Sequence, residues 1–333
     1  MTRQKKKRVL TIALDRLDRH VPFFMSAVTA PEGIELKPLE IGLAEARAYR
    51  DGYDRHGRMF RDLEFDICEQ SLASYIIARS RGDETLTASP VFPRRLFSQS
   101  CMFVNTSAGI DKPMDLIGKN VAINSLQTTL CVLARGDLKF EYGVSLEDIH
   151  WFVQREEELP LEGGHRGAVE PVPTGKQVDQ MLLEGELDAY IHPSPSALMY
   201  ARADRIRPLF ADARDESIRY FRRYGCCPIM HLMVFPRRTV DRDPWLPRAT
   251  IDMWNEAKDK ARAYFDDPGY SSMFFYRDAL KAEHIALGAD PWVSGLAANR
   301  SNLERFMGYM VDQKLIDEPI PLTQLFHESV LDT

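Results

Sequence analysis

Short apolar runs alternate with segments of helical periodicity through the first two thirds of this 333-residue chain. This alternation is typical of βα units arranged around largely parallel sheets, so it predicts an α/β fold. The expected strands are 9–14, 65–68, 100–104, 120–123, 189–191 and 228–235, and the expected helices are 72–80, 128–142 and 175–184. Beyond residue 244 the pattern is mainly helical, over 247–265, 271–283 and 299–313, and the charged, Gly/Pro-rich segment 156–173 is predicted to be a surface loop.

The length and the pattern together predict two α/β lobes with a ligand cleft between them and a helical C-terminal region. The first lobe is expected to be discontinuous, from residues 1–103 plus 233–333, with residues 104–232 inserted as the second lobe. The chain would then cross between the lobes near residues 104–110 and 222–232.

Charge and composition restrict the partners. Forty-three basic and 49 acidic residues give a net charge of −6, which does not favour nucleic acid or an anionic membrane as a partner. The first apolar run ends at Asp15, which is too early for a secretory signal. No apolar run reaches the roughly 20 residues needed to span a bilayer. Five cysteines without a C-x-x-C pair suit a reducing compartment. A cytoplasmic protein that binds a small molecule is therefore expected.

Familiar cofactor and hydrolase motifs are missing from the sequence. It contains no G-x-G-x-x-G after a strand, no Walker loop, no G-x-S-x-G elbow and no H-E-x-x-H. Nucleotide-dependent and standard hydrolase functions therefore lose support.

Polar side chains cluster where the expected strands end, which is where α/β sheets bind ligands. Glu69, Ser71 and Ser74 follow the strand at 65–68, and Ser71 could equally be a helix N-cap. Arg94 and Arg95 end another extended stretch and suit carboxylate recognition through the guanidinium fork. The last set follows strand 120–123 as a helix start that could hold an anion: Asn124, Ser125, Gln127 and Thr128.

Two histidines are candidates for proton transfer. His192 follows strand 189–191 and is locked by a proline, whereas His231 lies inside an apolar strand, where a buried core histidine is the ordinary alternative. Residues 51–56 (DGYDRH) carry ligand-like side chains, although a polar loop accounts for them equally well.

Several of these segments resemble the 4,5-dihydroxyphthalate decarboxylase family over nearly the whole chain. The resemblance rests on FDICEQSLASY (65–75), PVFPR (90–94), DLIGKNV (115–121), GELDA (185–189), PIMH (228–231), Asn299-Arg300 and PLTQLF (321–326). The pieces at 69–75 and 90–94 are the more specific, while Gly118-Lys119 and GELDA are shared broadly with solute-binding proteins. The resemblance implies a fold like that of the type II periplasmic solute-binding proteins, aromatic-compound catabolism and phthalate degradation.

The implied reaction is the non-oxidative decarboxylation of a hydroxylated aromatic acid, with 4,5-dihydroxyphthalate converted to protocatechuate. A proton reaches the ring carbon that bears the carboxylate while the para hydroxyl loses its proton, and the dienone-like intermediate then loses CO2. Arg94 or Arg95 would hold the second carboxylate, His192 or His231 would move the proton, and Glu69 could take or orient the phenolic proton.

Other functions stay open at this point. A solute-binding protein of the same fold could hold an aromatic or other carboxylate without chemistry, and a thiamine-precursor synthase is a more remote alternative. No cofactor, or a divalent metal on Glu69, His192 and His231, fits equally well, because sequence spacing across two lobes cannot separate the two. The helical C-terminal region also offers surface for a symmetric homo-oligomer.

Overall fold

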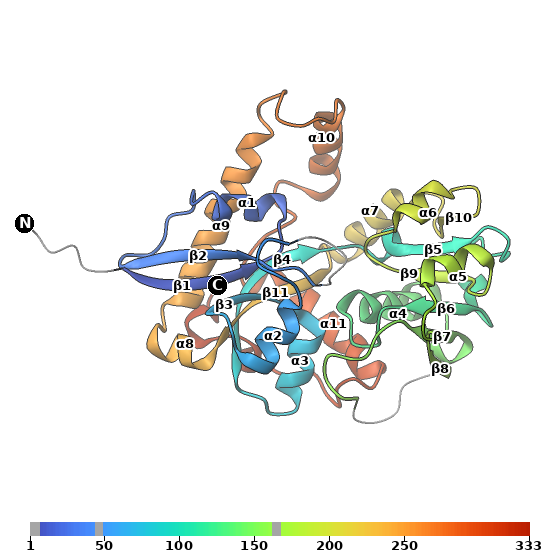
Figure 1. The fold of residues 1–333 in the computed structure, drawn as a ribbon, viewed down its shortest axis with the longest axis horizontal. Helices are drawn as coiled ribbons and strands as arrows, with labels where there is room; N and C mark the ends of the chain where they lie inside the picture. Colours follow the sequence, from blue (N-terminus) through green and yellow to red (C-terminus); the bar gives the residue numbers. More distant parts are fainter. Residues whose placement is uncertain (1–6, 44–48, 162–167) are drawn as a thin grey trace, which may run out of the picture.

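The computed structural model describes residues 7–43, 49–161 and 168–333. Its strands form two separate sheets (Figure 1). The strands are β1 (Arg8–Leu14), β2 (Ile34–Glu40), β3 (Ile67–Ser71), β4 (Leu86–Arg95), β5 (Met102–Asn105), β6 (Asn120–Ile123), β7 (His150–Val153), β8 (Ala168–Pro171), β9 (Ala189–Ile191), β10 (Ile206–Pro208) and β11 (Ile229–Pro236). The helices are α1 (Val21–Phe24), α2 (Arg55–Asp62), α3 (Leu72–Ser80), α4 (Thr129–Tyr142), α5 (Val178–Glu184), α6 (Ala197–Ala201), α7 (Ala213–Tyr224), α8 (Arg237–Arg242), α9 (Leu246–Tyr264), α10 (Tyr276–Leu287), α11 (Arg300–Asp312) and α12 (Leu322–Leu325).

The first sheet has the order β2-β1-β3-β11-β4 and the second has the order β10-β5-β9-β6-β7-β8. Strand β1 runs parallel to β2 and β3, while β11 pairs antiparallel with both β3 and β4. Strand β11 therefore returns the chain to the centre of the first sheet after the second sheet is complete. The residues on β3 and β4 that flank β11 become close neighbours in this way.

The change of sheet falls close to the expected lobe boundaries without coinciding with them. Strand β5 starts at Met102 and already belongs to the second sheet, and β11 belongs to the first sheet from Ile229 onward. An apolar run has the same pattern in either sheet, so the sequence alone cannot say which sheet it joins. The division into 1–103 plus 233–333 and 104–232 stays a prediction of domain organisation.

Several elements differ from the sequence expectation. Strand β8 lies inside the segment expected to be a surface loop, and residues 162–167 of that segment lie outside the described residues. Strand β2 was not expected because its alternation is weak and Pro38 interrupts it, which suits its place at the sheet edge. Helix α10 begins at Tyr276 instead of residue 271.

Helices α3, α4 and α11 form the packed region that joins the two lobes. Helix α4 is almost wholly buried, and one continuous apolar core includes Tyr75 of α3, Leu133 of α4 and Phe306 of α11. Gly136 of α4 lies against the ring of Tyr309, where a Cβ atom would overlap the ring. The ends of α3 and α4 are therefore fixed relative to each other by close packing.

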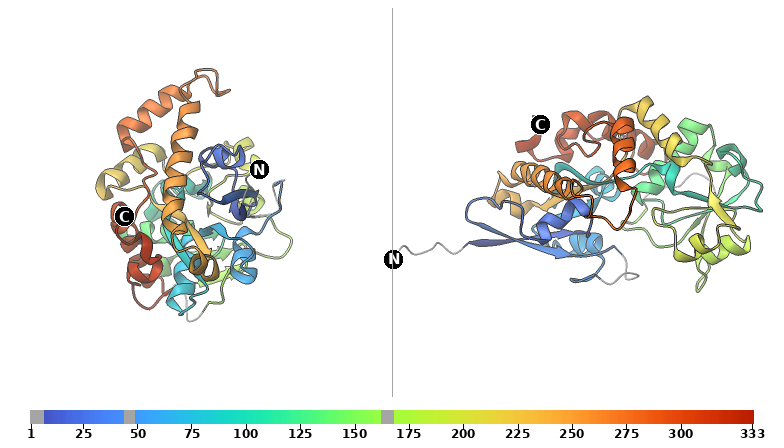
Figure 2. Two further views of the ribbon diagram at one scale, coloured as in Figure 1. Left: turned by 90° about the vertical axis from the view of Figure 1, so that its left-hand side faces the viewer. Right: turned by 90° about the horizontal axis from the view of Figure 1, so that it is seen from above.

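The C-terminal region adds a long helix, α9, and an arm that carries α10 away from the body (Figures 1 and 2). The arm exposes Phe274 and Phe275 by 96% and 79%. Along the described chain, none of the helices combines the length and the apolar character that a bilayer crossing requires. Whether the C-terminal region serves an oligomer stays a prediction.

Candidate active site

Glu69 and His231 form a buried pair in the middle of the first sheet. Glu69 lies on β3, His231 lies on the neighbouring β11, and the Glu69 Oε1 and His231 Nδ1 atoms are 2.5 Å apart. Glu69 is fully buried, while His231 keeps 7% of its surface exposed. The carboxylate therefore lies behind the imidazole, and the imidazole lies closer to solvent.

Arg55 holds the other side of the Glu69 carboxylate. It is the first residue of α2 and is completely buried. Its Nη2 atom lies 3.2 Å from Glu69 Oε2, its Nε donates to the Glu69 carbonyl oxygen at 3.1 Å, and its Nη1 donates to the carbonyl oxygen of Ile41. The backbone N–H of Asp15 donates to Glu69 Oε2 as well, at 3.3 Å. Both carboxylate oxygens are thus occupied by protein donors.

These contacts set the protonation states of the pair. Burial alone would raise the pKa of Glu69, but the Arg55 charge and the His231 hydrogen bond hold that pKa well below its usual range. Burial lowers the pKa of His231, although Glu69 opposes the shift. At neutral pH the carboxylate is ionised and the imidazole is neutral. Nδ1 then carries the proton donated to Glu69, which leaves Nε2 as a proton acceptor.

Two further histidines surround the pair. The His56 ring lies edge-on to the His231 ring at a centroid distance of 5.1 Å, and the Nδ1 atom of His20 lies 2.7 Å from the Asp15 carbonyl oxygen. Burial lowers the pKa of His20 to about 4 and the pKa of His56 well below its usual value. Both rings are therefore neutral, so Arg55 is the permanent positive charge next to Glu69.

Arg94 and Arg95 have different surroundings. His231 faces Arg94 across β11 and β4, and Arg94 Nη1 lies 3.6 Å from Asp15 Oδ2, partly exposed. The Arg95 side chain is buried and donates to the carbonyl oxygens of Cys227 and Val293 and to Asn299 Oδ1, at 2.8, 2.9 and 2.6 Å. Successive side chains on a strand point to opposite faces. Arg94 thus lies beside the histidine, and Arg95 ties the C-terminal region to β4.

Ser71 and Ser74 lie where the two lobes meet. Ser71 faces His231 across β3 and β11, and its Oγ atom lies 3.0 Å from the Thr129 Oγ1 atom of the second lobe. Ser74 Oγ donates to Ser71 Oγ at 3.3 Å, and the N–H of Ala73 donates to Thr129 Oγ1 at 3.1 Å. The N-terminal ends of α3 and α4 therefore meet next to the Glu69–His231 pair.

The expected anion-binding helix start at Asn124–Thr128 has internal partners. The N–H groups of Leu126 and Gln127 donate to the carboxylate of Glu157 at 2.6 and 2.9 Å. The Gln127 side chain bonds to both backbone groups of Leu159, and Ser125 Oγ lies 3.0 Å from Thr128 Oγ1. The site is built for a carboxylate, and here the carboxylate comes from the chain itself.

His192 lies on the opposite lobe from His231. It follows β9, which pairs with β6, so it shares the sheet edge that bears Asn124. Its ring stacks on Tyr190 at 5.0 Å, and its Nδ1 atom lies 2.7 Å from the Ser194 carbonyl oxygen. The two histidines proposed from the sequence therefore come from different sheets.

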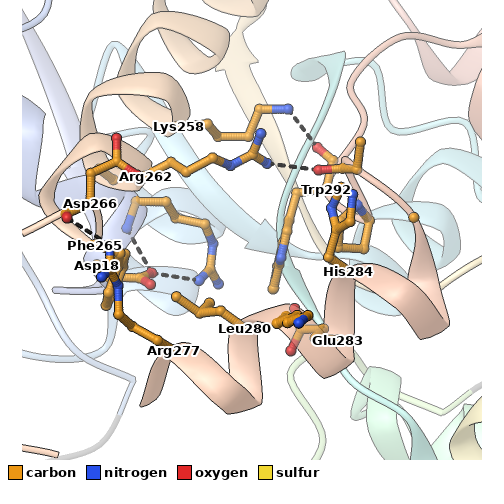
Figure 3. Close-up of a pocket in the computed structure, with 16 residues that line it drawn as sticks. Asp18, Lys258, Arg262, Phe265, Asp266, Arg277, Leu280, Glu283, His284 and Trp292 are labelled. Atoms are coloured by element: carbon orange, nitrogen blue, oxygen red, sulfur yellow. Dashed lines mark hydrogen bonds and ion pairs between the residues drawn. The ribbon is translucent and has the colours of Figure 1, made fainter. Parts of the chain in front are cut away.

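A pocket of about 590 Å³ lies between α9, α10 and the segment around Trp292 (Figure 3). Basic side chains line it, among them Lys258 and Arg262, and Arg19 stacks on the Trp292 ring at 3.9 Å. Arg19 Nε also donates to the carbonyl oxygen of Pro93 at 2.6 Å, so the pocket borders the backbone that carries Arg94.

Metal binding was left open by the sequence. Within residues 7–43, 49–161 and 168–333, no three His, Cys, Asp or Glu side chains are arranged so that they could hold a metal ion.

Sequence reasoning did not single out Arg55, although it lies in the polar segment 51–56, which carries ligand-like side chains.

Comparisons with known proteins give two kinds of relative. No protein-family model matches the chain. The 4,5-dihydroxyphthalate decarboxylase of Comamonas testosteroni is 29% identical over 284 residues, which cover 83% of this chain and 86% of that protein. The 4,5-dihydroxyphthalate decarboxylase of Pseudomonas putida is 30% identical over 171 residues, which cover 50% of this chain and 66% of that protein.

Solved structures with the same fold are more distant in sequence. The periplasmic aliphatic sulphonate binding protein SsuA of Escherichia coli has a TM-score of 0.56 at 12% identity, covering 98% of this chain and 99% of that one. A putative periplasmic sulfonate-binding protein SsuA of Methylobacillus flagellatus has a TM-score of 0.57 at 13% identity, covering 98% of this chain and 94% of that one. The two-lobed, periplasmic-binding-protein-like α/β fold expected from the sequence is confirmed.

Proposed function

From the premise that this chain is a relative of the 4,5-dihydroxyphthalate decarboxylases, we propose that it is a carboxy-lyase that removes CO2 from a hydroxylated aromatic carboxylic acid. The expected reaction is the conversion of 4,5-dihydroxyphthalate to protocatechuate. The observation that carries the proposal is the buried Glu69–His231 pair, placed between Ser71 and Arg94 where the two lobes meet.

Arg94 is the proposed anchor for a substrate carboxylate. It is partly exposed, it lies beside His231, and the weak 3.6 Å pairing with Asp15 leaves guanidinium donors for a ligand. Arg95 does not suit this role, because its side chain is buried and its Nη1 and Nη2 groups are spent on carbonyl and amide oxygens of the protein. A guanidinium fork binds a carboxylate through two parallel hydrogen bonds and so fixes the orientation of the ring.

His231 is the proposed proton-transfer group, and Glu69 is its positioning residue. Since Nδ1–H is held by Glu69, Nε2 can accept the proton of the phenolic hydroxyl para to the leaving carboxylate. The imidazolium that forms is stabilised by the ionised carboxylate behind it. Arg55 keeps Glu69 ionised throughout, so Glu69 acts through His231 without touching the substrate.

The proposed reaction balances as a proton exchange. The ring carbon that bears the carboxylate gains a proton while the para hydroxyl loses one, which gives a dienone-like intermediate. The bond between that carbon and the carboxylate then breaks, CO2 leaves, and its electron pair returns to the ring to restore aromaticity. A phenolate remains and regains its proton from the imidazolium. His192, on the facing lobe, is the candidate donor of the proton to carbon.

Incubation with hydroxylated phthalates tests the proposal. Purified protein should release CO2 from 4,5-dihydroxyphthalate and form a monocarboxylic catechol without NAD, flavin or oxygen. His231→Asn should lower turnover by about 10²–10⁴-fold while substrate affinity stays nearly unchanged. His150→Asn, at an exposed position on β7, is the matched control and should leave turnover unaltered.

A binding protein that performs no chemistry is the second candidate, favoured by the fold shared with the sulfonate-binding proteins. A receptor needs arginine and helix N–H donors but gains nothing from a neutral histidine backed by an ionised carboxylate. Tight binding of the whole substrate panel without any product, in the presence and absence of divalent metals, would favour this candidate over the enzyme.

A further inference from the structure

The segment that follows β7 crosses from the second lobe toward α2 of the first lobe. Strands β6 and β7 are parallel neighbours, so their carboxyl ends lie at the same edge of the second sheet. The N–H of Arg155 donates to the Asn124 carbonyl oxygen at 3.0 Å, which fixes the start of the segment to the loop after β6. Farther along, burial raises the pKa of Glu158, and two charged groups of α2, Asp54 at its N-cap and Arg61 in its last turn, also act on that pKa.

Glu157 anchors this segment on the start of α4. Its two carboxylate oxygens accept from the N–H groups of Leu126 and Gln127, and the Gln127 side chain holds the backbone of Leu159 through two hydrogen bonds. The Glu157 carboxylate accepts two N–H hydrogen bonds at the positive end of the 14-residue helix α4, so it attaches the segment firmly to the start of that helix. The N–H groups that the sequence offered to a substrate carboxylate are therefore already in use.

Arg155 is brought to the lobe boundary by this attachment. Its Nη2 atom donates to Thr128 Oγ1 at 3.3 Å, and the neighbouring Thr129 contacts Ser71 across the boundary. Burial is the main cause that lowers the pKa of His56, the Arg155 charge adds a smaller lowering, and the His56 ring packs against His231. The side chain stays 51% exposed and pairs with Glu158 at 3.6 Å. A guanidinium thus stands within electrostatic reach of the histidines, with donors still available.

We propose that Arg155 binds the second carboxylate of an aromatic dicarboxylate, from the second lobe, while Arg94 binds the first carboxylate from the first lobe. This inference rests on the proposed function and adds to it a further substrate-binding residue on the second lobe. Glu157 is then a positioning residue that holds Arg155 in place. A ring gripped from both lobes by two guanidinium groups would be held in one orientation relative to His231.

Binding of compounds that cannot react isolates the role of Arg155 from any catalytic step. Phthalate carries two adjacent carboxylates and no hydroxyl, and benzoate carries one carboxylate. Arg155→Ala should weaken phthalate binding about 10- to 150-fold, the range for a lost charged hydrogen-bonding contact, and should change benzoate binding less than about twofold. The phthalate affinity of Arg155→Lys should lie between that of the wild type and that of Arg155→Ala. Arg202→Ala, an exposed and ion-paired arginine of the same lobe, should bind both compounds normally.

Glu157→Gln separates the proposed role from the alternative in which the helix start itself binds substrate. If Glu157 positions Arg155, the variant should bind phthalate more weakly and benzoate unchanged. Tighter phthalate binding by this variant would mean that Glu157 competes with the ligand for the N–H groups of Leu126 and Gln127, and would overturn the inference. Equal losses for phthalate and benzoate in Arg155→Ala, or no loss for either, would overturn it as well.

The outcome is independent of whether the protein is an enzyme. Should the wild type bind phthalate through Arg155 yet never release CO2, the proposed function fails and the dicarboxylate site stands. Should the wild type decarboxylate its substrate while Arg155→Ala keeps the full preference for phthalate over benzoate, the site assignment fails and the enzyme stands.

Discussion

Replacing Arg55 by methionine leaves the Glu69 carboxylate buried without its cation. The ionised group would keep only the His231 ring and the Asp15 N–H, and the carbonyl oxygen of Ile41 would lose a donor. Breaking a buried ion pair by removing one partner costs about 3–5 kcal/mol. We therefore expect the free energy of unfolding to fall by about that amount at pH 7.5, which lowers the folded-to-unfolded ratio by about 10²–10⁴-fold.

The penalty of Arg55→Met should shrink as the pH falls. Without Arg55, Glu69 attracts a proton onto His231, so the folded pKa of His231 rises above its unfolded value of about 6.5. A raised histidine pKa contributes stability that is fully present below the unfolded pKa and is lost as the pH rises through the folded pKa. In the wild type the pKa of His231 is lowered, so its contribution has the opposite sign and stability is lost on acidification below about 6.5. The difference between the two proteins should be larger at pH 7.5 than at pH 5.5.

Urea unfolding followed by tryptophan fluorescence at both pH values measures this difference, with the slope m checked for constancy. Arg58→Met is the matched control, because Arg58 lies on the same helix and pairs with Glu64 at the surface, where an ion pair contributes at most about 1 kcal/mol. The double variant Arg55→Met/Glu69→Gln should recover most of the lost stability. A loss below about 1 kcal/mol for Arg55→Met, or a loss that does not depend on pH, would refute the reasoning.

Three further predictions follow from particular contacts. Arg94→Ala should weaken phthalate binding about 10- to 150-fold in calorimetric titrations, whereas Arg95→Ala should mainly lower the melting temperature; the reverse pattern would place the anchor on Arg95. Gly136→Ala should destabilise the protein by about 1–3 kcal/mol, because a methyl group there meets the aromatic ring of Tyr309. Gly308→Ala, in open space on α11, should stabilise the protein by about 0.5–1 kcal/mol. Equal effects of the two variants in denaturant titrations would contradict the packing described. Burial raises the pKa of Asp137 to about 7, so the stability that this group contributes is lost as the pH rises from about 4 through 7. Asp137→Asn should remove that part of the pH dependence, and a melting profile parallel to the wild type over this range would disprove the assignment.

The ends of the strands expected from the sequence coincide with much of the candidate site. Glu69, Ser71 and Arg94 follow or end expected extended segments, and β11 brings His231 between the last two. The choice between Arg94 and Arg95 could not be made from the sequence, because alternation tells only that they face opposite ways. Which face meets the cleft depends on the partners of the strand, and those come from residues more than 130 positions away.

The contribution of Arg55 was out of reach of local patterns for a similar reason. A buried arginine carries no periodicity signal of its own, and its pairing with Glu69 exists only because α2 packs on β3. Glu157 is the same kind of case. The start of α4 reads as an anion site because its N–H groups are free in principle, and only the fold shows that a carboxylate of the neighbouring loop occupies them.

Decarboxylation in D2O shows whether this chain replaces an aromatic carboxylate by a proton from solvent and whether His231 is needed for that exchange. The protein is incubated without oxygen with 4,5-dihydroxyphthalate that carries ¹³C in its carboxylates, and the products are followed by NMR. We expect labelled CO2 to appear together with protocatechuate bearing one deuterium on the carbon that lost the carboxylate, and we expect both signals to be nearly absent with His231→Asn. If the substrate is recovered unchanged, with both labelled carboxylates and no deuterium on its ring, at protein concentrations at which all of it is bound, this chain is not a decarboxylase of that substrate.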